Sequence, residues 1–322
     1  MKAHLVSLAG MLLAAASPAL GQEPLTAAGP QGALAGTLVR PAEGQPVILM
    51  IPGSGPTDRD GNNPAGVTAA PYRLLAEALG ARGIGTVRID KRGMFGSKAA
   101  VADANAVTLD AYATDVLAWI DATRDATGAQ CVWLLGHSEG GLVALVTSEK
   151  ARHLCGLILV AAPGRPMGTI LREQLSANPA NAPLLPDATS AIERLEKGER
   201  VDVGAMHPAL QGLFAPAVQG YLIDMLSRDP ATLLAGVDLP VLIVQGDRDL
   251  QITVADGEAL HAGKASATYV VAPAMNHVLK NVTSNEPAAN YAAYADPSLP
   301  IAPELVEAIA SFVSAPAGRK GE

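Results

Sequence analysis

The sequence lacks several features that mark common functional classes. Its 322 residues carry 23 Lys and Arg against 31 Asp and Glu, a formal net charge of −8. A net charge this negative argues against a nucleic-acid partner. No G-x-G-x-x-G or P-loop motif stands at a strand-to-helix junction, and no cluster of His, Cys and carboxylates has metal-ligand spacing. We therefore expect no cofactor, no metal ion and no nucleic acid.

Long apolar runs are also scarce, and the only notable one lies at the N-terminus. Residues 1–21 have the pattern of a secretory signal peptide, with an apolar run over 5–16 behind a positive charge. Small residues, Ala19 and Gly21, precede the expected cleavage before Gln22. We expect a periplasmic or secreted protein with no membrane span after cleavage. The alternative is an uncleaved anchor, although the run is short of the ~20 residues that a span needs.

Only two cysteines are present, Cys131 and Cys155. Each stands just before an expected strand, at 132–135 and 156–160. If these strands are parallel neighbours in register, the two Cα atoms fall within range of a disulfide. An exported protein would meet an oxidising compartment, which favours the bond. Two buried free thiols are the alternative.

The residues that are present centre on the motif G-H-S-E-G at 136–140, between an apolar strand and an apolar helix-like run. The pattern G-x-S-x-G in that context is the nucleophile elbow. The turn is so tight that Ser138 is pushed out above the sheet, and a Cβ at the two glycines would collide with backbone. The following helix directs its free N–H groups and positive dipole end at the reaction centre.

A serine nucleophile needs a general base and an orienting carboxylate, in the chain order Ser, Asp or Glu, His. His277 is the candidate base because it follows the last expected strand, at the rim where active-site groups of such sheets lie. The histidines that we consider less well placed are His153, His207 and His261. Asp249 is the candidate acid, and Asp247 is better explained as a turn residue.

An oxyanion hole requires two N–H donors. The backbone N–H of Glu139 should supply one, and the glycine-rich turn P-G-S-G-P should supply the other, from Ser54 in preference to Gly55. An ordinary flexible loop is the alternative. We also expect the Glu139 carboxylate either to be solvated or to pair with one of two arginines, Arg59 or Arg92.

Strands of buried type alternate with amphipathic helices, which predicts a mainly parallel sheet covered on both faces. A hairpin over 25–39 should start it. The expected strands are 47–51, 85–89, 132–135, 156–160, 241–244 and 268–271, and the expected helices start at Pro71 and Thr108 and cover 169–175, 188–197, 217–228, 254–261 and 303–313. The alternation breaks over 165–236, which predicts a helical cap between core segments 22–164 and 237–313, with a loose tail at 314–322.

Five motifs in this order resemble the α/β-hydrolase superfamily. They are P-G-S-G-P-T-D-R-D-G-N at 52–62, D-K-R-G at 90–93, G-H-S-E-G-G at 136–141, Q-G-D-R-D at 245–249 and N-H at 276–277. The chain is most similar to bacterial serine carboxylesterases related to dienelactone hydrolases and prolyl-oligopeptidase-like domains. The resemblance implies an eight-stranded sheet, a cap after the sixth strand, and ester hydrolysis. The chain departs from the usual R-G-x-G-x-S spacing at 93–97.

These observations predict a cofactor-independent serine hydrolase of small carboxylic esters that forms an acyl-enzyme on Ser138. Alternatives are another acyl hydrolase on the same fold, such as a peptidase, lactonase or thioesterase, or a non-catalytic binding protein. No binding role requires the serine, aspartate, histidine and glycines together, which argues against the last. Apolar cap residues either line the substrate pocket or, in the interpretation that we prefer, mostly pack the cap itself: Leu171, Leu213, Phe214, Tyr221, Leu222 and Met225. No pattern indicates an oligomeric state.

Overall fold

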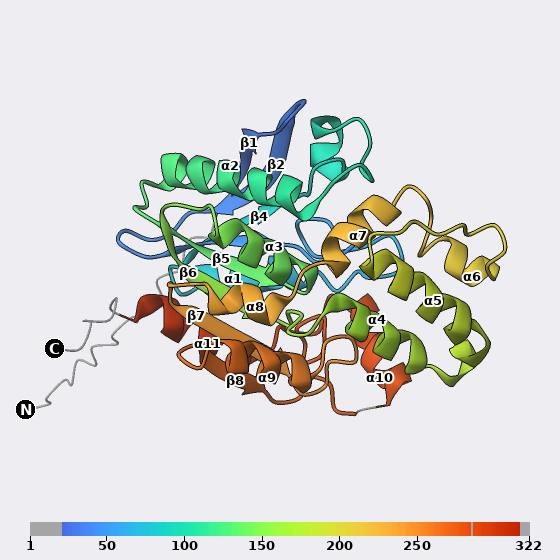
Figure 1. Cartoon of the computed structure of the whole chain (residues 1–322). Helices are drawn as coiled ribbons and strands as arrows, with labels where there is room; N and C mark the ends of the chain where they lie inside the picture. Colours follow the sequence, from blue (N-terminus) through green and yellow to red (C-terminus); the bar gives the residue numbers. More distant parts are fainter. Residues whose placement is uncertain (1–20, 285, 316–322) are drawn as a thin grey trace, which may run out of the picture.

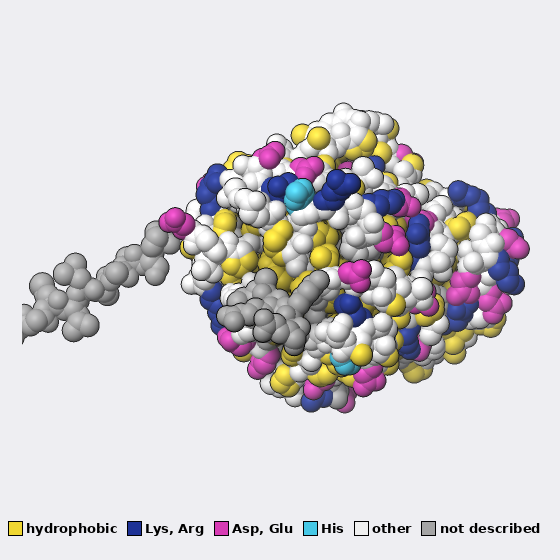
Figure 2. Space-filling view, turned by 60° about the vertical axis from the view of Figure 1, so that its left-hand side comes forward, with side chains coloured by type: hydrophobic (Ala, Val, Ile, Leu, Met, Phe, Trp, Pro, Cys, Tyr) yellow, Lys and Arg dark blue, Asp and Glu magenta, His cyan; other side chains and the backbone are white. Residues whose placement is uncertain are grey.

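A computed structural model of the chain describes residues 21–284 and 286–315. The expected signal peptide, apart from its last residue, and most of the expected tail lie outside the described residues. In the described part, no helix has the length and apolar character to cross a bilayer. On the face drawn in Figure 2, Lys and Arg side chains lie among Asp and Glu side chains.

One sheet of eight strands forms the centre of the fold (Figure 1). The strands are β1 (Gln22–Ala28), β2 (Ala33–Val39), β3 (Val47–Ile51), β4 (Gly85–Ile89), β5 (Val132–His137), β6 (Leu154–Val160), β7 (Val241–Gly246) and β8 (Thr268–Ala272). Their order in the sheet is β1-β2-β4-β3-β5-β6-β7-β8. β1 and β2 form an antiparallel hairpin at one edge, and β3 to β8 run parallel. The expected hairpin, strand count and mainly parallel pairing are confirmed.

The central strands are apolar along their whole length because both faces of the sheet are covered. In β3, Leu49 and Ile51 belong to one core, while Ile48 and Met50 belong to the core on the opposite face. This alternation is the period of two that a strand imposes on its side chains.

Helices supply the other half of each core. The helices outside the segment between β6 and β7 are α1 (Pro71–Gly80), α2 (Leu109–Thr127), α3 (Glu139–Ser148), α9 (Val254–Gly263), α10 (Pro287–Ala292) and α11 (Pro303–Ser314), with short 3-10 turns η1 (Phe95–Ala100) and η3 (Ala293–Ala295). α1 and α11 cover one face, and α2, α3 and α9 cover the other. The Thr108 side chain accepts a hydrogen bond from Ala111 N–H at 3.0 Å, so the expected cap of α2 is confirmed.

The segment between β6 and β7 is helical. It contains α4 (Met167–Ser176), the 3-10 turn η2 (Pro179–Leu184), α5 (Leu185–Glu196), α6 (Pro208–Gln211), α7 (Gln219–Leu226) and α8 (Pro230–Ala235). We refer to residues 165–236 as the cap; in Figure 1, α4 to α7 lie together at one side of the sheet. α8 instead packs on α3 and α9 of the core. The short helices α6 and α8 were not predicted, because one or two turns show no periodicity.

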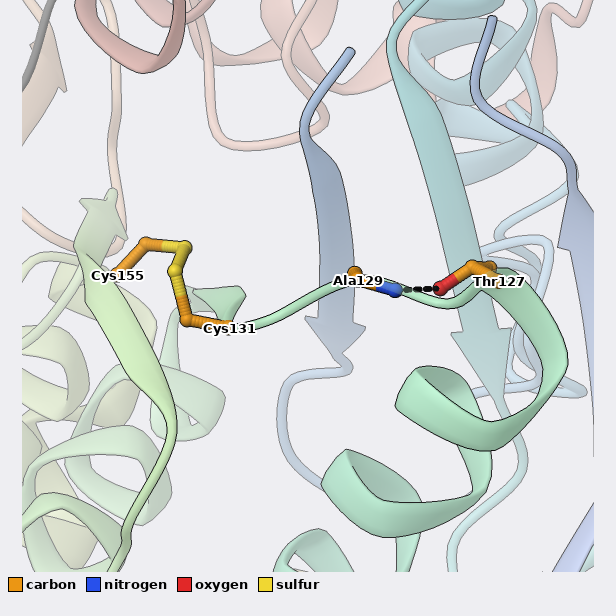
Figure 3. Close-up of a disulfide and its surroundings, with 4 residues drawn as sticks. All are labelled: Thr127, Ala129, Cys131 and Cys155. Carbon is orange, nitrogen blue, oxygen red and sulfur yellow. Dashed lines mark hydrogen bonds between the residues drawn. A yellow bond between two sulfur atoms is a disulfide. The ribbon is translucent and has the colours of Figure 1, made fainter. Parts of the chain in front are cut away.

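Cys131 and Cys155 form a disulfide with a Cα–Cα distance of 5.2 Å (Figure 3). The expectation that Cys155 precedes its strand is wrong, since β6 already begins at Leu154. The register between β5 and β6 shifts so that Val132 pairs with Leu154 and Trp133 with Gly156. Cys155 is therefore the unpaired residue of a bulge. The disulfide lies at the amino ends of β5 and β6, the rim opposite to Ser138.

Candidate active site

Ser138 occupies the turn between β5 and α3 in a strained conformation, with φ 54° and ψ −129°. The two glycines around it permit this turn. A Cβ on Gly136 would lie 2.2 Å from the Gly140 carbonyl oxygen, and a Cβ on Gly140 would lie 2.3 Å from that of Ile51. Any larger residue at either position would force the strand and helix apart. The half-buried serine lines a cavity at this end of the sheet.

Asp249 and His277 come together at the same rim, beyond the carboxyl ends of β7 and β8. The His277 Nδ1–H donates to Asp249 Oδ2 at 2.8 Å. The other oxygen of this carboxylate accepts from the N–H groups of Gln251 and Ile252, at 2.8 and 3.0 Å. Because the carboxylate only accepts, the neutral ring keeps its proton on Nδ1 and leaves Nε2 free to take one. Asp247 instead accepts from the backbone N–H of Ala274 at 2.7 Å.

His277 and Ser138 both line the cavity. Among the described residues, the Ser138 hydroxyl makes no hydrogen bond to the His277 ring. Catalytic contacts of this kind commonly tighten only when substrate is bound. The three remaining downstream histidines lie elsewhere. His153 directly precedes β6 at the opposite rim, His207 precedes α6 in the cap, and His261 of α9 stacks on Tyr269 of β8.

A buried chain of hydrogen bonds, which sequence reasoning missed, connects the loop after β3 to the loop that carries His277. Gly53 N–H donates to the Tyr72 hydroxyl at 3.0 Å, and that hydroxyl lies 2.8 Å from His137 Nδ1. His137 Nε2 lies 2.9 Å from the His277 carbonyl oxygen. A carbonyl can only accept, so Nε2 carries the proton and Nδ1 accepts from Tyr72.

The pKa shifts of His137 and Tyr72 favour the same placement of protons along these hydrogen bonds. Burial, and next the neighbouring His277, hold the pKa of His137 well below its ordinary value of 6.5. Burial raises the pKa of Tyr72, so its hydroxyl keeps the proton that it donates. His137 stands next to Ser138 inside the elbow motif, but the chain order Ser, acid, His points only to histidines after the serine.

The loop after β3 meets the start of α3 through Ser54 and Glu139. The Ser54 hydroxyl donates to Glu139 Oε2 at 2.9 Å, and Lys91 Nζ lies 3.4 Å from Glu139 Oε1. The expectation that Glu139 pairs with an arginine is therefore wrong. Arg59 binds Asp90 instead, and Arg92 binds Asp115. Lys91 reaches Glu139 because it follows β4 at the rim of the sheet. Arg92, the next residue, points the other way and binds Asp115 of α2.

The cavity has a volume of about 510 Å³ and is bounded on one side by the cap. Five of the six apolar cap residues named from the sequence line it: Leu171, Leu213, Tyr221, Leu222 and Met225. Only Phe214 is buried away from it. Of these five, all except Leu213 also belong to the hydrophobic core or pack against it, so the same side chains pack and line the cavity. Among the described residues that line the cavity, Glu139 is the one acid and Lys91 the one Lys or Arg, and the two are paired.

This sheet, with a serine at the elbow and a carboxylate–imidazole pair beyond the next strands, defines an α/β-hydrolase. The sequence matches the family described as serine aminopeptidase, S33, over residues 65–282, and the chain belongs to that family.

Named relatives agree with this class. The chain is 27% identical over 241 residues to esterase EstD from Thermotoga maritima, a match that covers 73% of this chain and 54% of the relative. The chain thus spans about half the length of that protein. Two solved structures show the same fold. A thermophilic esterase from Thermogutta terrifontis is 21% identical, with a TM-score of 0.53 and coverage of 91% of this chain and 98% of that one. A hydrolase from Pseudomonas aeruginosa PA01 is 20% identical, with a TM-score of 0.55 and the same coverages.

Proposed function

We propose that this protein is a serine hydrolase that cleaves small, uncharged carboxylic esters. The observation that carries the proposal is the 2.8 Å contact of His277 Nδ1 with a buried Asp249 carboxylate, in the cavity that the strained Ser138 also lines. A histidine without a function is rarely held in one tautomer by a buried carboxylate, in a cavity that a strained serine also lines. The esterase names of the relatives support the same reaction.

In the proposed reaction, Ser138 Oγ attacks the acyl carbonyl and His277 Nε2 takes its proton. Asp249 stabilises the imidazolium and does not itself take the proton. The backbone N–H groups of Glu139 and Ser54 receive the oxyanion. Collapse expels the alcohol, which leaves with the proton from His277. Water then attacks the acyl-enzyme, with His277 as base, and releases the acid and the free serine.

The charge of the cavity favours esters over peptides with a free amino terminus. An aminopeptidase would need a carboxylate to bind the substrate ammonium group. The one carboxylate among the described lining residues, Glu139, is already engaged by Ser54 and Lys91. The paired charges leave a cavity with no net charge, lined by the apolar cap side chains. This environment suits a neutral ester whose acyl or alcohol part is apolar.

A panel of p-nitrophenyl esters from acetate to palmitate, with alanine p-nitroanilide as the peptidase substrate, tests the proposal. We expect hydrolysis of the short and medium esters and little of the anilide. Ser138→Ala should lose about 10³-fold or more in kcat and stay folded. Ser148→Ala, the matched control at the far end of α3, should keep wild-type kcat. A folded wild type that hydrolyses no ester would contradict the proposal and would favour a non-catalytic binding protein.

Export to the periplasm or the cell exterior is part of the proposal. Its support is the Cys131–Cys155 disulfide, because such bonds persist in oxidising compartments. β1 begins at Gln22, so cleavage before that residue would leave the sheet intact. N-terminal sequencing of the protein made with its own leader should begin at Gln22. A sequence that begins at Met1 would contradict the cleavage.

A further inference from the structure

The orientation of one peptide group decides whether the proposed oxyanion hole exists. The second donor is the N–H of Ser54, which belongs to the peptide that also carries the Gly53 carbonyl. Every peptide bond in the described residues is trans. In a trans peptide the C=O and the N–H point in opposite directions, so whatever holds the carbonyl also aims the N–H.

Lys91 holds that carbonyl. Its Nζ donates to the Gly53 oxygen at 2.7 Å, from a side chain that is 4% exposed. The Ser54 N–H must therefore point away from Lys91. Among the described residues, this N–H has no hydrogen-bond partner, whereas the Gly53 carbonyl and both the hydroxyl and the carbonyl of Ser54 are engaged. A free donor beside a nucleophile is what an oxyanion hole requires.

Two further contacts hold the residues on either side of this peptide. Gly53 N–H is held by the Tyr72 hydroxyl at 3.0 Å. The Ser54 hydroxyl donates to Glu139 Oε2, and the other Glu139 oxygen lies 3.4 Å from Lys91 Nζ. Glu139, which supplies one proposed donor, is thus joined through its side chain to Ser54, which supplies the other, and to Lys91. The Glu139 N–H lies in the first turn of α3, where N–H groups have no partner within the helix.

We propose that Lys91 is the positioning residue of the oxyanion hole, which it acts on through the Gly53 carbonyl without touching the substrate. This inference rests on the proposed function. With Lys91 absent, rotation about the bonds on either side of the peptide can exchange the carbonyl and the N–H. The carbonyl oxygen would then face the developing negative charge and repel it. Loss of one oxyanion donor lowers kcat by about 10²–10³-fold.

The test compares Lys91→Met with the matched control Lys98→Met. Methionine has nearly the length of lysine but donates no hydrogen bond, and Lys98 is an exposed lysine in the next turn of the chain. Two inhibitors separate an effect on the oxyanion hole from an effect on binding in the cavity. A trifluoromethyl ketone is attacked by Ser138 Oγ, whose proton passes to His277, and the resulting hemiketal oxyanion occupies the hole. The matching methyl ketone fills the same cavity largely without addition.

For Lys91→Met we expect kcat for a p-nitrophenyl ester and affinity for the trifluoromethyl ketone to fall by the same factor, about 10²–10³. Methyl ketone affinity and KM should stay at wild-type values, and Lys98→Met should match the wild type throughout. A folded Lys91→Met that keeps kcat would overturn the inference. So would an equal loss of affinity for both ketones, which would indicate a collapsed cavity.

Lys91→Arg keeps the charge but displaces the hydrogen-bond donor. It replaces Lys91→Met in the same measurements if Lys91→Met does not fold. Its kcat and trifluoromethyl ketone affinity should fall in parallel, by less than in Lys91→Met. A fall in kcat without loss of trifluoromethyl ketone affinity would contradict the inference. Failure of the proposed function is distinct: the wild type itself would then hydrolyse no ester and would not distinguish the two ketones.

Discussion

Replacing both cysteines by alanine should lower stability and leave catalysis intact. The disulfide joins residues 24 apart in the sequence. The chain-entropy relation for a closed loop of that length gives a loss of about 3.5 kcal/mol at 25 °C. With an unfolding entropy of about 2.1 cal/mol/K per residue, a chain of this size should melt about 5 °C lower.

The catalytic rate should not follow that loss, because the disulfide and Ser138 lie at opposite ends of β5. Urea unfolding and thermal melting of Cys131→Ala/Cys155→Ala give the stability, and ester hydrolysis at 25 °C gives kcat. The control is the wild type in excess reductant, which should be destabilised by the same amount. A double variant as stable as the oxidised wild type would refute the loop-entropy reasoning. A folded variant with reduced kcat would refute the separation of the two rims.

Two further predictions concern the residues of the site. Asp249→Asn should lower kcat by about 10⁴-fold, because the tautomer of His277 is no longer fixed. Asp247→Asn should change kcat little, and the reverse result in ester kinetics would assign the acid to Asp247. Burial holds the pKa of His137 well below 6.5, so below that pH the unfolded chain binds a proton that the folded one does not. As pH falls through this window, the wild type should lose up to about 1.4 kcal/mol per pH unit through this group. His137→Gln should lack that share of the pH slope in urea unfolding, and an unchanged slope would count against a neutral, buried His137.

The parts of the fold that could be predicted are those with a local pattern. Fully apolar runs of five residues, as in Val47–Ile51, mark strands covered on both faces, and Thr108 marks the start of a helix. The placement of His277 and Asp249 followed from one rule, that side chains just beyond parallel strands share a rim. That rule requires no knowledge of the strand order.

The parts that could not be predicted depend on contacts between distant residues. Tyr72 and His137 are 65 positions apart, and Lys91 and Glu139 are 48 apart, so no local pattern connects them. Arg59 and Arg92 were reasonable partners for Glu139 by charge alone. Which cation reaches the carboxylate depends on where β4 ends, and that is a property of the sheet register. The bulge at Cys155 escaped prediction for the same reason.

In the proposed function, Ser138 is a nucleophile that His277 activates. Peptide mapping by mass spectrometry after incubation with a fluorophosphonate tests it most directly. We predict one phosphonyl adduct, on Ser138, in the wild type and almost none in folded His277→Ala over the same time. A folded wild type that carries no adduct, or carries it on another residue, would contradict the claim.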